Sequence, residues 1–295
     1  MTTVVQLVVN ALSLGSTYAL LALGLTLVFS VMNLINFAYG MLLVWSGYMA
    51  ILMVDHHVPG VLVVALCVLF TTLLAMVMGR VAFRPFINAP PITLLITSFG
   101  VELVMQYAVV LAFGENPHVF PTPTFLDSVL HVGGVLVPTV ELTTIATALV
   151  AMIGLYVLLN RTAFGLQLRA AAERPDTARL MGVKPTRVLA IIFAISGAIA
   201  GVVGLLWFAK LGAVTPGSDL APTLKSFIAI VLGGLGSLRG AVLGGFVLGA
   251  LEALMGTYLP TGALNYQDAI VFGLVIAILL LRPGGLVGST VEPTR

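Results

Sequence analysis

Charged side chains are scarce in this sequence, and cysteine is almost absent. Only 8% of the 295 residues are Asp, Glu, Lys or Arg, whereas 60% are hydrophobic, and the mean hydropathy is +1.15. So few charges leave too little polar surface to cover a water-soluble globule of this length. The single cysteine, Cys67, excludes an intrachain disulfide and a multi-cysteine metal site, and we interpret it as a small packing residue.

Sequence motifs that are typical of enzymes are also missing. The sequence contains no GxxxxGK[ST] phosphate-binding loop, no HExxH metal motif and no nucleophile elbow. We therefore expect no catalytic residues, no metal and no cofactor bound by this chain, and translocation of a solute is favoured over catalysis.

The sequence instead contains long apolar runs. Several reach about 20 residues, the length that an α-helix needs to cross the hydrocarbon layer of a membrane. We therefore predict an all-α fold, a polytopic transmembrane helical bundle of about 8–10 spans, with one membrane domain over residues 1–295. The first run lacks a preceding basic region, which favours a retained span over a cleaved signal peptide. The runs are 4–31, 41–54, 61–83, 92–113, 143–160, 188–208, 225–254 and 268–281.

Asparagine and glycine interrupt the apolar sequence at two places, 33–40 and 233–240. The first interruption is consistent with a broken helix inside the membrane or with a short loop at its surface. In the second, each glycine inside a helix would cost about 1 kcal/mol relative to alanine, which indicates close packing, a break, or both. Interruptions in matching halves point to an inverted repeat lining a transport path. The candidates for this path are Asn33, Asn36, Tyr39, Gly40, Gly233, Gly234 and Gly236.

A polar row crosses the run at 92–113. Ser98, Glu102 and Gln106 follow at intervals of four, which places them on one face of a helix. A carboxyl group near the middle of a membrane costs about 2.5–3.5 kcal/mol on insertion scales, so Glu102 is expected to face a cavity or a polar partner. Contact with a solute and hydrogen bonding between helices both remain open, and we add the three residues to the path candidates.

The segment 161–187 is a polar island in this apolar chain. It holds six of the 13 Lys and Arg residues, and short basic loops tend to stay on the cytoplasmic side of a membrane. We therefore predict a cytoplasmic loop at 161–187, and Arg282 indicates a cytoplasmic C-terminus.

Two short helices are expected inside this loop, at 165–173 and 176–181. Pro175 is suited to the first position of the second helix, and Gly182 to a left-handed cap at its end. The small Ala178 with charged neighbours, Glu173, Asp176 and Arg179, would make a docking site for a cytoplasmic partner. The alternative is a solvated loop that only sets topology.

Five stretches carry a resemblance to a known family. Residues 176–182, DTARLMG, are similar to the EAA-x3-G coupling signature of ABC importer permeases, with Asp and Thr in place of Glu and the first Ala. Longer stretches resemble the permeases of branched-chain amino acid ABC importers, specifically the LivH-like subunit. These stretches are 18–40, 161–183, 227–245 and 266–286.

The resemblance implies a multi-pass permease of the bacterial plasma (inner) membrane that imports branched-chain or related amino acids. Its implied partners are the lipid bilayer, a second homologous permease subunit, two cytoplasmic ABC ATPase subunits that bind ATP and Mg²⁺, and an external solute-binding protein; nucleic acid is not among them. The alternative is an ion-coupled secondary transporter or channel for small solutes, for which Glu102 and Glu252 would supply intramembrane carboxylates. The resemblance assigns ATPase coupling to Arg169, Glu173, Arg174, Asp176, Ala178, Arg179 and Gly182.

Overall fold

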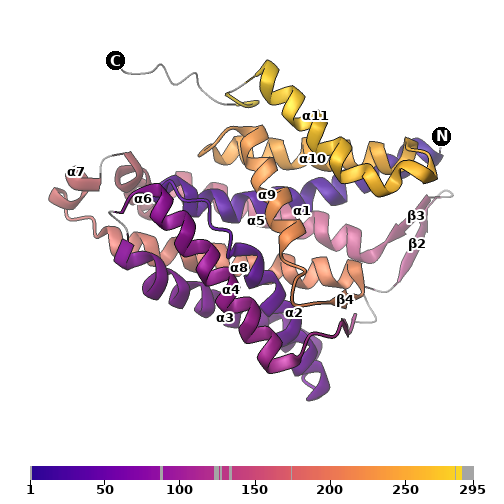
Figure 1. The fold of residues 1–295 in the computed structure, drawn as a ribbon, viewed down its shortest axis with the longest axis horizontal. Coiled ribbons are helices and arrows are strands. Elements are labelled where there is room, and N and C mark those ends of the chain that lie inside the picture. The colour runs from indigo at the N-terminus through magenta and orange to yellow at the C-terminus, as the bar shows by residue number, and fades with distance from the viewer. Residues whose placement is uncertain are drawn as a thin grey trace. The chain divides into compact units, whose positions relative to one another are not determined.

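Helices make up most of the described chain (Figure 1). In this computed structural model, the described residues are 2–86, 89–122, 126, 128–132, 135–173, 175–282 and 284–287. Among them, seven helices are long and apolar enough to cross a membrane, and α2 and α9 are shorter apolar helices. This confirms the predicted polytopic helical bundle. The α-helices are α1 (Thr2–Met32), α2 (Tyr39–Asp55), α3 (Gly60–Met78), α4 (Pro91–Phe113), α5 (Thr139–Arg161), α6 (Ala163–Glu173), α7 (Pro175–Leu180), α8 (Pro185–Leu211), α9 (Leu220–Gly233), α10 (Leu238–Tyr258) and α11 (Gln267–Leu281).

Short elements connect these helices. A π-helical turn, η1 (Gly79–Phe83), and a 3₁₀ turn, η2 (Arg84–Phe86), extend α3, and a 3₁₀ helix, η3 (Thr261–Tyr266), precedes α11. Two antiparallel strand pairs are present, β1 (His118–Val119) with β4 (Ala213–Val214), and β2 (Val129–Val132) with β3 (Val135–Pro138). The region 114–141, between the predicted runs at 92–113 and 143–160, therefore contributes three strands and the start of α5.

The chain divides into two compact units, each built from segments that are distant in sequence. Unit 1 contains Met1–Thr26, Thr124–Leu149 and Leu224–Arg295, and unit 2 contains Leu27–Pro123 and Val150–Thr223. Both units hold apolar helices of membrane-spanning length. One membrane domain over the whole chain stays a prediction.

Small residues on α8 hold unit 2 together. A methyl group added at Gly197 would lie 2.7 Å from the Thr71 carbonyl oxygen of α3, and one at Gly204 would lie 2.8 Å from the Leu43 carbonyl oxygen of α2. The Ser46 hydroxyl donates a hydrogen bond to the Gly201 carbonyl at 2.8 Å. Close backbone approach of this kind drives helix association in membranes, so these small residues allow α8 to pack against α2 and α3.

Unit 1 is organised around the contact between α1 and α10. Methyl groups added at Gly245 and Gly249 would fall on the backbone of Ala19 and Gly15, respectively. A methyl group at Gly15 would in turn lie 2.6 Å from Cδ1 of Phe246. The two helices therefore touch backbone to backbone, with no room for a side chain at either glycine.

The second predicted interruption is a true break in unit 1. Helix α9 ends at Gly233, and α10 begins at Leu238 after Ser237, whose hydroxyl accepts a hydrogen bond from the Gly240 amide at 3.0 Å. Gly234 and Gly236 adopt φ values of +109° and +81°, which residues with a Cβ rarely adopt. The run predicted at 225–254 is thus two helices.

Helix α9 also begins earlier than the sequence suggested. The predicted run begins at residue 225, but the helix already starts at Leu220. Pro222 and Asp219 are typical of loops, yet proline is compatible with the first turn of a helix because its missing N–H has no partner there.

Candidate functional site

Most of the first interruption is enclosed by protein, although Asn33 at its start is exposed. Helix α1 ends at Met32, Asn33 follows with φ +49°, and α2 begins at Tyr39. Within the interruption, Asn36 is 1% exposed, and Tyr39 is fully buried. Freed backbone groups at membrane depth are tolerated only where protein or water covers them. The burial favours a broken helix over a loop at the membrane surface.

Polar atoms in this interruption lack partners. Both side-chain amide atoms of Asn36 and the hydroxyl of Tyr39 are buried and make no hydrogen bond with any described residue. Buried polar groups in proteins are nearly always hydrogen-bonded. These atoms are therefore suited to bind the polar atoms of a solute that passes through.

The polar row of α4 starts beside the same interruption. The Ser98 hydroxyl donates to the Leu95 carbonyl at 2.8 Å and lies 3.5 Å from the Ile35 carbonyl. The rings of Phe37 and Phe99 stack with their centroids 4.4 Å apart. Helix α4 thus brings one end of its predicted polar face to the break between α1 and α2.

The other end of the row faces the connection between α8 and α9. Gln106 Nε2 is 3.6 Å from the position where Gly217 would carry a Cβ. The Glu102 carboxylate is close enough to act electrostatically on Asp219. This connection therefore folds back into unit 2, and Asp219 is only 4% exposed.

Gly40 allows the connection to approach α2. A methyl group at Gly40 would lie 2.6 Å from the Asp219 carbonyl oxygen and would collide with the Thr223 hydroxyl. That hydroxyl donates to the Asp219 carbonyl at 2.7 Å. We call the convergent residues of unit 2 the interruption site; they are Asn36, Tyr39, Gly40, Ser98, Glu102, Gln106, Asp219 and Thr223.

Asp219 gives this site its electrostatic character. Burial, with a further contribution from the negative charge of Glu102, raises the pKa of the Asp219 carboxyl to about 6. Asp219 lies in the connection at 212–219, outside the membrane-spanning helices. At neutral pH two carboxyl groups share the site, an arrangement that favours a cationic group between or beside them.

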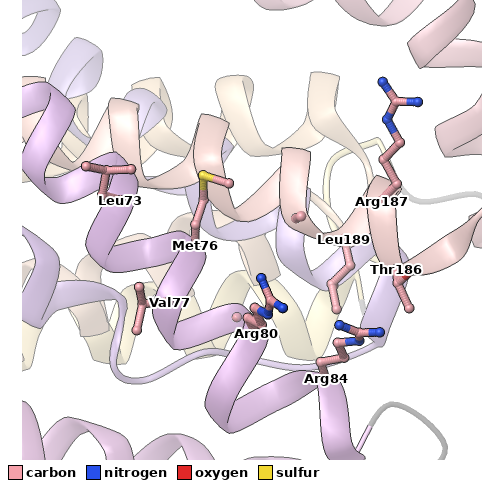
Figure 2. A pocket seen from close by; sticks show the side chains of 10 residues that line it. Leu73, Met76, Val77, Arg80, Arg84, Thr186, Arg187 and Leu189 are labelled. Carbon is pink, nitrogen blue, oxygen red and sulfur yellow. The ribbon is translucent and has the colours of Figure 1, made fainter.

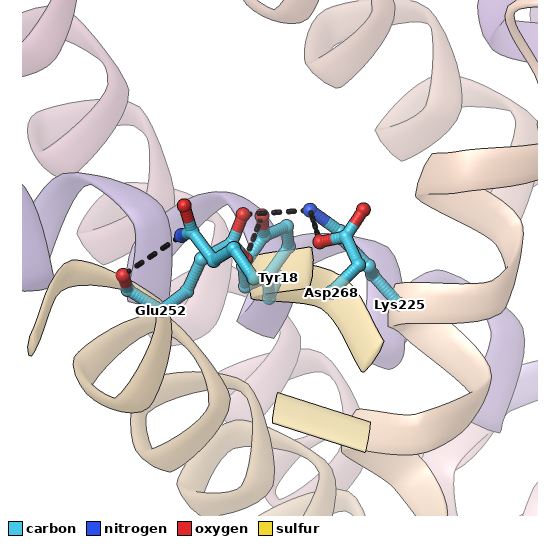
Figure 3. A network of polar contacts seen from close by, with 5 residues as sticks. Tyr18, Lys225, Glu252 and Asp268 are labelled. Carbon is cyan, nitrogen blue, oxygen red and sulfur yellow. Dashed lines mark hydrogen bonds and ion pairs between the residues drawn. The ribbon is translucent and has the colours of Figure 1, made fainter. Parts of the chain in front are cut away.

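A second polar network lies in unit 1 (Figure 3). The Lys225 ammonium of α9 is 2.6 Å from Glu252 Oε1 on α10 and 3.3 Å from Asp268 Oδ1 on α11. The Tyr18 hydroxyl of α1 donates to Glu252 Oε2 at 2.5 Å, and Gln267 Nε2 donates to the Glu252 carbonyl at 3.0 Å. The network joins four helices, and it leaves Glu252 engaged rather than open for a coupling ion.

The glycines of the second interruption allow close backbone contacts and the turn between α9 and α10. The backbones of Gly233 and Gly240 are in contact, and a methyl group at Gly285 would lie 2.7 Å from the Gly234 nitrogen. The amides of Leu286 and Val287 donate to the carbonyls of Leu232 and Gly233 at 2.9 and 3.1 Å. A role for Gly233, Gly234 and Gly236 in lining a path stays a prediction, as it does for Asn33, whose side chain is exposed.

The basic loop contains the two predicted helices, α6 and α7. As predicted, α7 begins at Pro175, and Gly182 after it has φ +82°. The Gly182 and Val183 amides donate to the carbonyls of Arg179 and Ala178, both at 3.0 Å. This is the hydrogen-bonded helix end that a left-handed glycine provides.

The coupling candidates differ in their surroundings. Arg169 Nη1 donates to the Leu159 carbonyl at 2.7 Å, so its guanidinium ties α6 to the end of α5. Ala178 is 3% exposed, and Arg179 is exposed. Arg174 lies outside the described residues, as do the side chains of Glu173 and Asp176.

Two apolar side chains at the end of α7 were missed from the sequence. Leu180 is 89% exposed and Met181 is 81% exposed. They follow Arg179 directly, and the signal for them was the presence of large apolar residues within an otherwise polar loop. Fully exposed apolar side chains rimmed by polar residues mark a surface for a partner.

Comparisons with known proteins cover almost the whole chain. The family model described as "Branched-chain amino acid transport system / permease component" matches residues 7–279. The chain is 32% identical over 295 residues to the high-affinity branched-chain amino acid transport system permease protein BraD of Pseudomonas aeruginosa, covering 96% of this chain and 95% of BraD. It is 33% identical over 297 residues to the corresponding permease protein LivH of Escherichia coli, with the same coverage. No solved structure matches.

Proposed function

Because the chain belongs to the family of permease components of branched-chain amino acid transport systems, we propose that it is the permease subunit of an ABC importer for branched-chain or related amino acids. The family match across residues 7–279 carries this proposal. The proposed partners are a second homologous permease, two cytoplasmic ABC ATPases that bind ATP and Mg²⁺, and an external solute-binding protein. The chain itself is proposed to bind neither a metal nor a cofactor.

The proposed orientation follows the basic residues. With 161–187 and the C-terminus on the cytoplasmic side of a bacterial inner membrane, the segment richest in Lys and Arg faces the cytoplasm, as the positive-inside tendency requires. Helix α7 then meets the ATPases. The interruption site belongs to the translocation path in this proposal.

The coupling step follows from the packing of unit 2. Helices α6 and α7 both contact α8, and α8 packs along α2 and α3. A push on α7 by a closing ATPase dimer would therefore reach α2, whose first residues Tyr39 and Gly40 belong to the interruption site. The exposed Leu180 and Met181 are suited to fill an apolar groove on the ATPase, the arrangement by which a short helix docks on a partner.

The double variant Leu180→Ser/Met181→Ser is expected to lose the ATPases. Well-packed apolar anchors contribute about 2 kcal/mol or more each to an interface, so loss of both should lower the affinity for the ATPases on the order of 1,000-fold. The measurement is co-purification of the membrane-extracted permease with its co-expressed ATPase subunits, together with ATP-dependent uptake in proteoliposomes.

The matched control is Leu211→Ser/Leu220→Ser. These two leucines are also exposed, at 57% and 61%, but Leu211 is the last residue of α8 and Leu220 the first of α9, away from α7 in the chain. The control variant should retain both the ATPases and uptake. If the wild-type chain transports amino acids without ATP or an ATPase, the ABC proposal is wrong and the ion-coupled alternative takes its place.

The interruption site is proposed to recognise the ammonium group of the passing amino acid. Asp219 and Glu102 supply negative charge, and the buried Asn36 amide and Tyr39 hydroxyl supply hydrogen-bonding atoms that no described residue uses. A solute with an ammonium group would be attracted to the two carboxylates and could bind the amide. Lowering the pH through 6 protonates Asp219 and should reduce transport.

Asp219→Asn is expected to slow uptake and yet to stabilise the fold. A carboxyl whose pKa is raised in the folded state favours folding below its unfolded pKa and loses that contribution as the pH rises through about 6. At pH 7.5 the neutral amide avoids this loss, so the melting temperature should rise by about 2–4 °C. At pH 5, where wild-type Asp219 is protonated, the difference should shrink.

The readouts are thermal unfolding at both pH values and ATP-driven uptake at pH 7.5. Asp55→Asn is the matched control, because Asp55 is an exposed acid at the end of α2 in the same unit. Asp55→Asn should change neither the melting temperature nor the rate of uptake. A destabilised Asp219→Asn variant with normal uptake would contradict the role given to this carboxyl.

A further inference from the structure

A cavity opens between α3 and α8 in unit 2, where the π-helical turn η1 ends α3 and where α8 begins (Figure 2). Its volume is about 410 Å³. Neither the interruption site nor the exposed end of α7 contributes a residue to its lining. The lining residues are Leu73, Met76, Val77, Gly79, Arg80, Arg84, Thr186, Arg187, Leu189 and Ala190.

The polar part of the cavity is strongly positive. Arg80, Arg84 and Arg187 contribute three guanidinium groups, and the lining contains no carboxylate. All three side chains are exposed, and none forms an ion pair with a described carboxylate. Figure 2 shows Arg80 and Arg84, four positions apart at the end of α3, which both line the cavity together with Leu189. Guanidinium groups that line one cavity are suited to bind the oxygens of a phosphate.

The other part of the cavity is apolar and open. Leu73 is 53% exposed, Met76 37% and Val77 56%, and all three lie on α3, a helix long enough to cross the membrane. These side chains sit within two turns of Arg80 on the side towards the middle of the helix. The cavity therefore runs from apolar side chains at membrane depth to a cluster of arginines at the helix end.

We propose that this cavity binds an anionic phospholipid, with the headgroup phosphate on Arg80 and Arg84 and an acyl chain along Leu73 and Val77. Basic pockets between membrane helices recognise anionic headgroups in this way. The start of α8 adds the positive end of a 27-residue helix. An acidic segment of a partner protein could satisfy the arginines but would leave the lipid-facing leucine and valine uncovered, so a lipid is the better match.

The lipid-binding constants of the purified, delipidated full-length protein test this proposal. Phosphatidylglycerol and phosphatidylcholine are titrated separately, and bound lipids are counted by native mass spectrometry. Wild type should bind one phosphatidylglycerol far more tightly than phosphatidylcholine. Arg80→Gln/Arg84→Gln should weaken phosphatidylglycerol about 25-fold, since each basic residue near a membrane surface contributes roughly fivefold.

Four further measurements separate the alternatives. Arg161→Gln/Arg239→Gln removes the same charge from exposed arginines outside the cavity and should leave the affinity for phosphatidylglycerol unchanged. Arg80→Lys/Arg84→Lys keeps both positive charges and should retain most of that affinity, which would show that the site folds. Equal competition by glycerol phosphate or inorganic phosphate would overturn the acyl-chain assignment. Loss of the lipid on assembly with the ATPases would instead identify the arginines as a protein contact and overturn the proposal.

Discussion

Replacing Lys225 by methionine is expected to cost the protein about 3–5 kcal/mol, because removal of one partner from a buried ion pair leaves the other charge uncompensated. Lys225 is 9% exposed, and it is the only cation in the network with Glu252 and Asp268 among the described residues. Without it, two carboxylates would meet between α10 and α11. The folded fraction after detergent extraction, followed by thermal size-exclusion chromatography, should fall steeply.

Two variants make this result specific to the network. Lys184→Met removes an exposed lysine and should leave the melting temperature close to that of the wild type. Lys225→Met/Glu252→Leu removes both buried charges and should recover much of the loss, since Asp268 is 61% exposed at its side chain and can be hydrated. A Lys225→Met variant as stable as the wild type would show that the ion pairs contribute nothing to unit 1.

Replacing Gly249 by leucine is expected to separate α1 from α10. The added Cβ would fall on the backbone of Gly15 and within 2.8 Å of the Leu14 carbonyl carbon. A backbone cannot rotate away as a side chain can, so the cost should reach about 3 kcal/mol or more. Gly249→Ala should already show a clear loss, because the first carbon atom makes the collision.

Gly273→Leu is the matched control on α11. Apart from its own stretch of helix, no described atom lies within 4 Å of the position that its Cβ would take, so this substitution should be tolerated. Protease resistance and the melting temperature in detergent compare the two variants. Equal tolerance of leucine at both positions would mean that α1 and α10 do not pack as closely as described.

The helices could be predicted because their signal is local. A run of about 20 apolar residues suits a membrane span wherever its neighbours lie, and Pro175, Gly182 and Pro185 mark helix ends through their own backbone preferences. The start of α9 at Leu220 could not be predicted, because Asp219 and Pro222 have the composition of a loop. Whether such a segment folds back on α4 depends on tertiary contacts.

The residues of the interruption site also divide into those with a local sequence signal and those that only tertiary contacts bring to the site. Ser98, Glu102 and Gln106 were found because their spacing places them on one helix face, and Asn36 because it interrupts an apolar run. Asp219 and Thr223 were missed, since only the fold brings them to Gly40. Arg80 and Arg84 stand close together at the end of the predicted run 61–83, but their cavity also needs Arg187 from the start of α8.

The contact between α1 and α10 also determines when unit 1 can form during synthesis. Tyr18 and its hydrogen-bond partner Glu252 are separated by 234 positions in the chain. At the usual rate of translation, about 5–20 residues per second, α1 therefore waits roughly 10–50 seconds for α10, the helix that covers Gly15. During that interval its glycine face is open to lipid or to the insertion machinery, and a nascent chain stalled before α10 would present this unpaired face to the cell's membrane proteases.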